Sequence, residues 1–462
     1  MWNDGYVMGI DYINAYFYGL NPLNIDFNLT LAGVKNTKDS SISYLELGFG
    51  KGYSLALHSV CNKGEFIGVD FNPSFAFNTK ELSPNSKIYN ESFKDFYKRA
   101  ISEKMSFDYI VLHGVWSWIN SKNKKYIQKI IDKCLNIGGI VYISYNSFPG
   151  WEGGYSLQKI LKAFEERQNG TPTTKIKNSL EILEQFSKIP MSFLQQNPKA
   201  KEEILYILNQ DISVLAHEFF NKHWSCHHFL DIAEMMQECK CEFASSANVL
   251  WHFDDLTLSQ EELNFLNTLQ CPLLQEQIKD FFVNRKFRAD LFIKGKCMLS
   301  TQEREQKLLK TAFVLLREDA KIQGLENIAE VQKIYSKILN FLTLDNFAPK
   351  TIEQIIQACD ITLLQVLQIL CVMMTYQITA PTQNISQTQI QNAKIFNHKA
   401  LQQNHDKVYL ASPLIGGGFS ITQQETIMLQ KFLHNSLQNP NTSLDSNFTS
   451  PNLSLYQKLG IL

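Results

Sequence analysis

Residues 44–52 read YLELGFGKG, a glycine-rich run between an apolar stretch and an amphipathic one. Its glycines permit a tight turn and a close approach to a ligand, and the following helix offers free N–H groups. Asp70 ends the next apolar run, eighteen residues after Gly52, where a carboxylate can accept both hydroxyls of a ribose. The stretch therefore predicts two points of one nucleoside site.

A carboxylate inside this turn separates it from dinucleotide-binding turns. A nicotinamide-binding turn has its third glycine one position later than Gly52, where this chain has Tyr53. Glu46 would repel two phosphates, but it would attract, directly or through water, the cationic amino group of a methionine moiety. The charge favours S-adenosylmethionine over NAD. An ordinary glycine-rich turn is the structural alternative.

Apolar runs alternate with amphipathic stretches through the first third of the chain. Five runs predict strands, at residues 42–47, 66–70, 87–89, 107–112 and 140–145. The alternation predicts an α/β fold with a Rossmann-like, doubly wound parallel sheet. An aromatic N-terminal segment that includes Tyr6 and Tyr12 is expected to cover the open end of this sheet.

The pattern changes to long helical periods after Trp151. At roughly 100 to 200 residues per domain, the length of 462 residues predicts three domains. We expect them at 1–155 (cofactor binding), 156–300 (mainly helical, with isolated strands at 241–250 and 287–294) and 301–462 (partner or substrate contact). The third domain has the order helix, helix, helix, strand, which is also found in winged-helix units.

Charge and composition exclude several classes of protein. With a net charge of −1, the chain lacks the broad basic field of non-specific nucleic-acid binders. Residues 351–382 contain no Lys or Arg, so we expect this stretch to contact protein and not DNA. The longest apolar stretch is too short for a bilayer, and no export signal is visible, so a cytoplasmic protein without membrane insertion is expected. The nine scattered cysteines suit reduced thiols.

Polar and aromatic residues follow the predicted strands at the edge where ligands of parallel sheets bind. Residues 90–93 follow the third strand, where such folds contact an adenine. His113 ends the fourth strand, where the reacting centre is expected, and Trp116 follows it; packing in the core is the alternative for both. Tyr145 ends the fifth strand and is expected to line a substrate channel.

Six segments together resemble class I methyltransferases that carry a methyltransferase regulatory domain. They are 2–7 (WNDGYV), 21–23 (NPL), 46–50 (ELGFG), 70–73 (DFNP), 113–118 (HGVWSW) and 144–151 (SYNSFPGW). The last two are similar, more distantly, to segments of rickettsial lysine methyltransferases that modify outer-membrane proteins. The likeness covers roughly residues 1–155, continues at 217–221 and 281–288, and thins after about 300.

This resemblance implies methyl transfer from S-adenosylmethionine to lysine side chains of a protein. The expected cofactor-binding residues are Glu46, Gly48, Phe49, Gly50, Gly52, Asp70, Phe71, Asn72, Glu91, Ser92, Phe93 and His113. The expected catalytic residues are Tyr12, His113, Trp116 and Tyr145, of which His113 is a proton acceptor or a cofactor-orienting group. The sequence departs from the family at Phe49, where many members have a small residue or cysteine, and at 90–91, where an aspartate is usual.

Two further His-containing patterns do not match known metal sites. His217-Glu218 lacks the second histidine of a zinc protease, because residue 221 is Asn, and the His/Cys group at 223–241 matches no common zinc module, so no metal is expected.

Two alternative functions stay open. The chain could methylate a small molecule or glycan, or it could be a binding protein that holds the cofactor without transferring its methyl group. The acceptor's identity, the degree of methylation and a homodimeric state also stay open.

Overall fold

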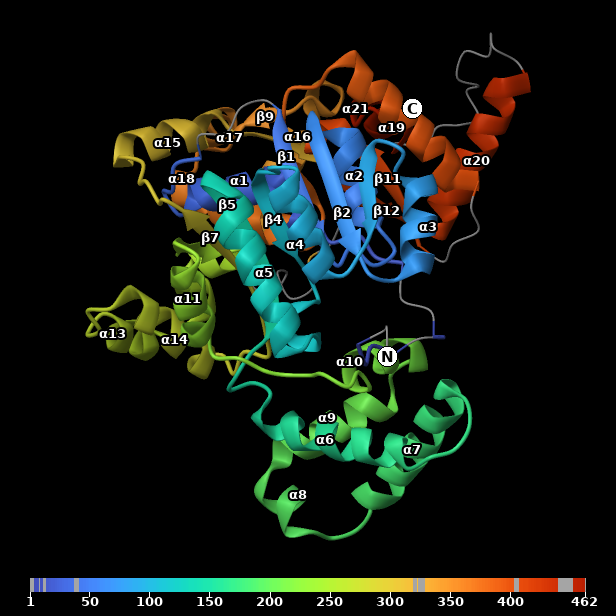
Figure 1. Cartoon of the computed structure of the whole chain (residues 1–462). Helices are drawn as coiled ribbons and strands as arrows, with labels where there is room; N and C mark the ends of the chain where they lie inside the picture. Colours follow the sequence, from blue (N-terminus) through green and yellow to red (C-terminus); the bar gives the residue numbers. More distant parts are fainter. Residues whose placement is uncertain are drawn as a thin grey trace.

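A computed structural model describes residues 4–7, 9–10, 14–36, 41–318, 322, 329–402, 407–438 and 452–461. At its centre lies a seven-stranded sheet in the order β3-β2-β1-β4-β5-β7-β6 (Figure 1). Its strands are β1 (Ile42–Leu47), β2 (Gly64–Asp70), β3 (Ser86–Asn90), β4 (Phe107–Leu112), β5 (Leu135–Asn146), β6 (Cys241–Ser246) and β7 (Phe287–Lys294). The five predicted strands and the Rossmann-like α/β class are confirmed.

The sheet is mixed rather than wholly parallel, which corrects one expectation. β1 to β5 pair in parallel, whereas β7 runs antiparallel to both β5 and β6. The prediction of isolated strands at 241–250 and 287–294 is therefore wrong, because β6 and β7 extend the central sheet. Strand β7 pairs with β5 from Ile140–Ile293 to Asn146–Phe287, so residues far beyond the first predicted domain complete its sheet.

Helices cover both faces of the sheet. They are α1 (Pro22–Leu31), α2 (Tyr53–Cys61), α3 (Pro73–Leu82), α4 (Phe93–Ser102), α5 (Ser121–Cys134) and α11 (Phe229–Glu238). Alternate strand residues enter two cores, with Leu45 and Leu47 packed beside α4, α5 and α11, and Tyr44 packed beside α1 to α3. Because β1, β2 and β4 run parallel, their carboxyl ends lie at one edge of the sheet.

A group of helices stands apart from the sheet, next to the N-terminal segment (Figure 1). We call α6 (Glu152–Glu166), α7 (Pro172–Ser187), α8 (Ser192–Gln196), α9 (Pro198–Leu208) and α10 (Ile212–Phe219) the helical lobe. It has its own apolar core, which includes Trp151, Leu161 and Phe219. Beyond it, α12 (Asp254–Thr257), α13 (Gln260–Leu266) and α14 (Pro272–Phe282) lead back to β7 and the sheet.

The C-terminal third packs against the glycine-turn side of the sheet. Its elements are α15 (Thr301–Lys310), β8 (Ala312–Leu315), α16 (Ala329–Phe347), β9 (Lys350–Thr351), α17 (Ile352–Cys359), α18 (Leu363–Thr375), β10 (Thr379–Pro381), α19 (Gln387–Gln402), β11 (Val408–Ser412), β12 (Gly417–Ile421), α20 (Gln423–Gln438) and α21 (Asn452–Lys458). Leu57 and Cys61 of α2 share one core with Leu410 and Phe419. This third therefore supports the helix that begins at the glycine turn.

Helices α16, α17 and α18 followed by β10 reproduce the expected order of helix, helix, helix, strand. Strand β8 completes a three-stranded sheet in the order β10-β8-β9, and the winged-helix assignment stays a prediction. Within the described ranges no single helix reaches the length and apolarity of a membrane span; α17 and α18 reach them only as a pair bent by 112°.

Candidate cofactor and substrate site

The turn after β1 requires glycine at two positions. Gly48, Gly50 and Gly52 have φ angles of 75°, 57° and 73°, in the left-handed region. A Cβ atom at Gly48 would lie 2.5 Å from Cγ2 of Val115, and one at Gly52 would lie 2.3 Å from Cγ2 of Thr79. The glycine-rich run at residues 44–52 thus forms a turn that does not accommodate larger side chains at Gly48 and Gly52.

Asp70 fastens this turn to the end of β2. Its Oδ2 accepts a hydrogen bond from the Gly50 N–H at 3.0 Å, and its Oδ1 accepts one from the Asn72 N–H at 2.9 Å. Burial raises the pKa of Asp70 to about 6, although both N–H groups lower it. Each carboxylate oxygen keeps a second lone pair, so Asp70 can position the turn and accept hydroxyl groups of a ligand.

Glu46 is a buried carboxyl group with an unsatisfied oxygen. Its side chain is on β1, the residue is 4% exposed, and its Oε2 has no hydrogen-bond partner in the described part of the chain. Burial, and then the charge of Asp70, raise its pKa to about 8. A cationic group bound next to Glu46 would satisfy this oxygen and favour the carboxylate form.

A cavity of about 310 Å³ opens at the carboxyl ends of β1, β2 and β4, and we call it the strand-end cavity. Ten of the predicted site residues line it: Glu46, Gly48, Phe49, Gly50, Asp70, Phe71, Glu91, Ser92, Phe93 and His113. Gly52 and Asn72 are absent from this lining. Both residues act at helix N-termini instead. Gly52 precedes α2, and the Asn72 side chain caps α3 by accepting a hydrogen bond from the Ser74 N–H.

The polar residues expected near an adenine, Glu91 and Ser92, already take part in an ion pair and a helix cap. Glu91 Oε1 accepts from Arg99 Nε at 2.9 Å, so the Glu91 carboxylate, which stands where an aspartate is usual, is ion-paired. Ser92 caps α4, since its Oγ accepts from the Asp95 N–H. Phe93 lies in the cavity wall and in the core. An adenine here would meet the apolar wall and the second oxygen of Glu91.

His113 lies in the strand-end cavity between aromatic neighbours. Its Nδ1 is 2.9 Å from the hydroxyl oxygen of Tyr142, and the Phe17 ring centroid is 4.1 Å from the His113 ring centroid. Burial lowers the pKa of His113 to about 4. The ring is therefore only weakly basic, and this favours the orienting role over that of proton acceptor.

Trp116 and Tyr145 do not line the strand-end cavity, which corrects their expected catalytic roles. Trp116 is buried in the core beside α5, with Lys124 Nζ 5.3 Å from its ring centroid. Tyr145 is 0% exposed, and its hydroxyl donates to Oδ2 of Asp290 at 2.6 Å. Both side chains hold the sheet together instead of facing a ligand. Tyr12, the remaining catalytic candidate, lies outside the described residues.

Several residues of the strand-end cavity come from segments outside the strand ends. Tyr6, Phe17, Trp118, His217, Glu218 and Asn221 all line the strand-end cavity. Asn221 Oδ1 accepts from the Val7 N–H at 2.9 Å, which ties the N-terminal segment to the end of α10. Residues 217–221 resemble the regulatory domain in sequence. This resemblance does not indicate that they lie next to the ends of β1, β2 and β4.

No metal centre is evident at this site or elsewhere in the described chain. Nowhere within those residues do three or more His, Cys, Asp or Glu side chains gather as a metal ion requires. The strand-end cavity instead combines buried carboxyl groups, a glycine turn and aromatic rings, a combination that suits an organic cation.

An uncharacterized protein of Synechocystis, sll1526, is 30% identical to this chain over 446 residues, which are 93% of this chain and 87% of that protein. This chain belongs to the family of sll1526. A family model described as a predicted methyltransferase regulatory domain matches residues 211–294, from α10 through β7. In this family member, the regulatory domain thus supplies two strands of the central sheet and part of the cavity wall.

Solved structures share this architecture along almost the whole chain. PKMT2 from Rickettsia typhi is similar with a TM-score of 0.69 and 17% identity, over 97% of this chain and 96% of that one. The same protein in complex with AdoHcy is similar with a TM-score of 0.68, also at 17% identity and with the same coverage. At this identity the likeness shows the fold. The predicted class I methyltransferase fold with a regulatory domain is confirmed.

Proposed function

We propose that this protein transfers a methyl group from S-adenosylmethionine to a lysine side chain of another protein. The observation that carries the proposal is the meeting of Glu46, the glycine turn and Asp70 in one cavity at the strand ends. Methyl transfer is further supported by the regulatory-domain match. The lysine acceptor is supported by the likeness of residues 113–118 and 144–151 to rickettsial lysine methyltransferases.

The residues of the strand-end cavity fit this cofactor, which supplies an electrophilic methyl group on a sulfonium when it is bound. The unsatisfied Oε2 of Glu46 suits the cationic amino group of the methionine part. Asp70 has lone pairs left for the ribose hydroxyls. Phe93 and Glu91 offer an apolar wall and an acceptor for an adenine. A Cβ at Gly48 would collide with Cγ2 of Val115, so the turn keeps its shape at the cavity only with glycine there.

A lysine acceptor must lose its proton before it can act as a nucleophile. With a pKa of about 10.4, neutralising it at pH 7 costs about 4.6 kcal/mol. Tyr6, Phe17 and Trp118 line the cavity, where they exclude water and disfavour the charged amine. The same rings can hold the cation before it loses its proton. The chain thus contributes desolvation and positioning.

Labelled S-adenosylmethionine incubated with the purified chain and fractionated lysate tests the proposed function. We expect label on protein, and mass spectrometry of the labelled protein should show methyl increments on lysine. Label on carboxylates, hydroxyls, small molecules or glycans only would contradict the lysine acceptor and leave methyl transfer standing. Cofactor binding without any transfer would support a regulatory binding protein instead.

His113→Ala is expected to reduce turnover less than about 10²-fold, which is the lower bound for the loss of a general base. The physical reason is that burial lowers the pKa of His113 to about 4, so the ring is a poor proton acceptor for an amine. Cofactor affinity should fall as well, because the ring packs on Phe17 in the cavity wall. A loss of 10² to 10⁴ in turnover at unchanged affinity would make His113 the base.

A further inference from the structure

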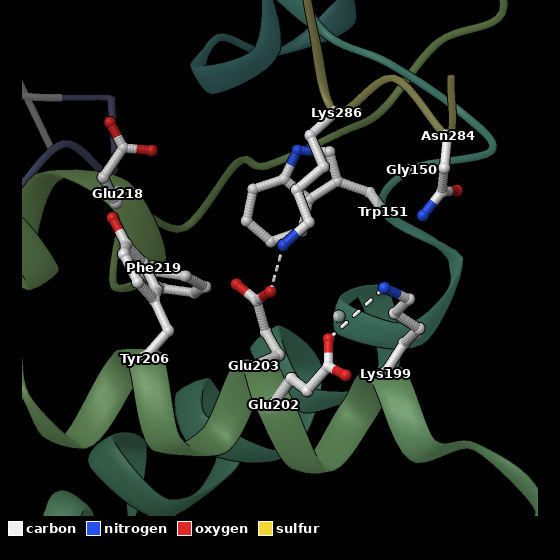
Figure 2. Close-up of a pocket in the computed structure, with 12 residues that line it drawn as sticks. Gly150, Trp151, Lys199, Glu202, Glu203, Tyr206, Glu218, Phe219, Asn284 and Lys286 are labelled. Atoms are coloured by element: carbon white, nitrogen blue, oxygen red, sulfur yellow. Dashed lines mark hydrogen bonds and ion pairs between the residues drawn. The ribbon is translucent and has the colours of Figure 1, made fainter. Parts of the chain in front are cut away.

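A second cavity, of about 480 Å³, lies between the helical lobe and the segments that flank β5 and β7 (Figure 2). We call it the lobe cavity. Helix α9 supplies Glu202, Glu203 and Tyr206, and α10 supplies Glu218 and Phe219. Trp151 and Lys286 face them from the opposite side in Figure 2. The cavity thus combines carboxylates with aromatic rings, which is the lining that organic cations prefer.

Negative charge is in excess on this lining. Lys286 pairs with Glu203, and Lys199 pairs with Glu202 at 3.3 Å, so both lysines of the lining are neutralised. Glu203 has a side chain that is only 5% exposed, and its Oε1 has no partner among the residues that the structure describes. A third carboxylate, Glu218, has no cation paired with it in that part of the chain. A cationic ligand would balance the charge.

Glu218 is the residue that the linings of both cavities have in common. Its backbone carbonyl accepts from Nε1 of Trp118 at 3.3 Å, which fixes this turn of α10 against the sheet domain. In the described part of the molecule, its carboxylate takes part in no hydrogen bond or ion pair. Figure 2 shows this carboxylate turned away from Glu202 and Glu203. The two cavities therefore adjoin at one unpaired carboxylate.

We propose that the lobe cavity is the docking site of the lysine-bearing segment of the protein substrate, and that Glu218 binds the lysine ammonium and accepts a proton from it. This inference rests on the proposed function. In the proton transfer, one N–H bond of the ammonium breaks and an O–H bond forms on the Glu218 carboxylate. The electron pair stays on nitrogen, so a neutral amine results at the boundary with the strand-end cavity.

The electrostatic surroundings of Glu218 suit such a transfer. Burial raises its pKa to about 7, so carboxylate and carboxylic acid are both populated near neutral pH. The other titratable groups on the lobe-cavity lining are Lys199, Glu202, Glu203, Tyr206 and Lys286. Those on the strand-end lining are Asp4, Tyr6, Glu46, Asp70, Glu91, Lys94, His113, Lys122 and His217. Lys286 on the far side of the lobe cavity is occupied by Glu203.

Binding measurements on the full chain test the inference without depending on turnover. The probe is Nα-acetyl-lysine methyl ester, titrated by calorimetry and by NMR into the chain saturated with S-adenosylhomocysteine. We expect Glu218→Gln to weaken probe binding at least tenfold and to leave the affinity for S-adenosylhomocysteine within twofold. Glu218→Asp should recover part of the loss, because it keeps the charge one methylene further back. Glu184→Gln, an exposed carboxylate on α7 paired with Lys188, is the matched control and should change nothing.

The outcomes separate the two proposals. If S-adenosylhomocysteine fails to bind the wild-type chain, the proposed function is wrong. If it binds but the probe does not, or if Glu218→Gln binds the probe as the wild type does, the assignment of Glu218 is overturned while the proposed function stands. The pH dependence of probe binding offers an independent check, since an apparent pKa near 7 should be present in the wild type and lost in Glu218→Gln.

Discussion

Asp70→Ala is expected to weaken the binding of S-adenosylmethionine and S-adenosylhomocysteine by tenfold or more. The variant loses hydrogen bonds to a charged group, each worth about 1.5 to 3 kcal/mol. It also leaves the N–H groups of Gly50 and Asn72 without the carboxylate that now holds them. The glycine turn should then lose its fixed position. Isothermal titration calorimetry measures the change.

A control variant, Asp132→Ala, and a second ligand, NAD, test whether this loss of affinity is specific. Asp132→Ala removes a carboxylate on α5 that pairs with Lys133 and does not line the strand-end cavity, so its cofactor affinity should match the wild type. NAD should bind none of these proteins, because the turn has Tyr53 where a nicotinamide-binding turn has its third glycine. An Asp70→Ala protein that binds S-adenosylhomocysteine as tightly as the wild type would refute the role of Asp70.

Arg288→Met is expected to lower the free energy of unfolding by about 3 to 5 kcal/mol, the range for breaking a buried ion pair from one side. The Arg288 guanidinium is 0% exposed and binds Asp280 on α14 at 2.7 Å and Asp290 on β7 at 2.8 Å. Tyr145 on β5 donates to the same Asp290. Removal of the cation leaves the buried Asp290 without an ion pair, while Asp280 keeps its pair with Arg285. Urea unfolding measures the change.

Lys87→Met is the matched control for this prediction. Lys87 pairs with Glu65 at the exposed edge of β2 and β3, where more than half of the lysine side chain is in contact with solvent. Exposed ion pairs contribute about 0 to 1 kcal/mol, so the control should be nearly neutral. A loss below about 1 kcal/mol for Arg288→Met would show that water or rearrangement compensates Asp290.

Local sequence patterns predict those parts of the fold that depend on short stretches of chain. The alternating apolar runs predict the five parallel strands, and the glycines at 48, 50 and 52 predict the turn after β1. Both predictions succeed because strand period and glycine conformation are local properties. The sequence also determined that Glu46 and Asp70 meet, since the carboxyl ends of neighbouring parallel strands share one edge of a sheet.

The contacts between residues of distant segments depend on the tertiary structure. The pattern at 287–294 is that of a buried strand, but its pairing with β5 depends on contacts about 150 residues apart along the chain, which periodicity does not encode. The same limit made Tyr145 look like a channel residue, although Asp290 on β7 buries its hydroxyl. Tyr6 lies at this cavity as expected for the aromatic N-terminal segment. His217 and Glu218 line it because α10 packs against that segment, and such packing is a property of the folded chain as a whole.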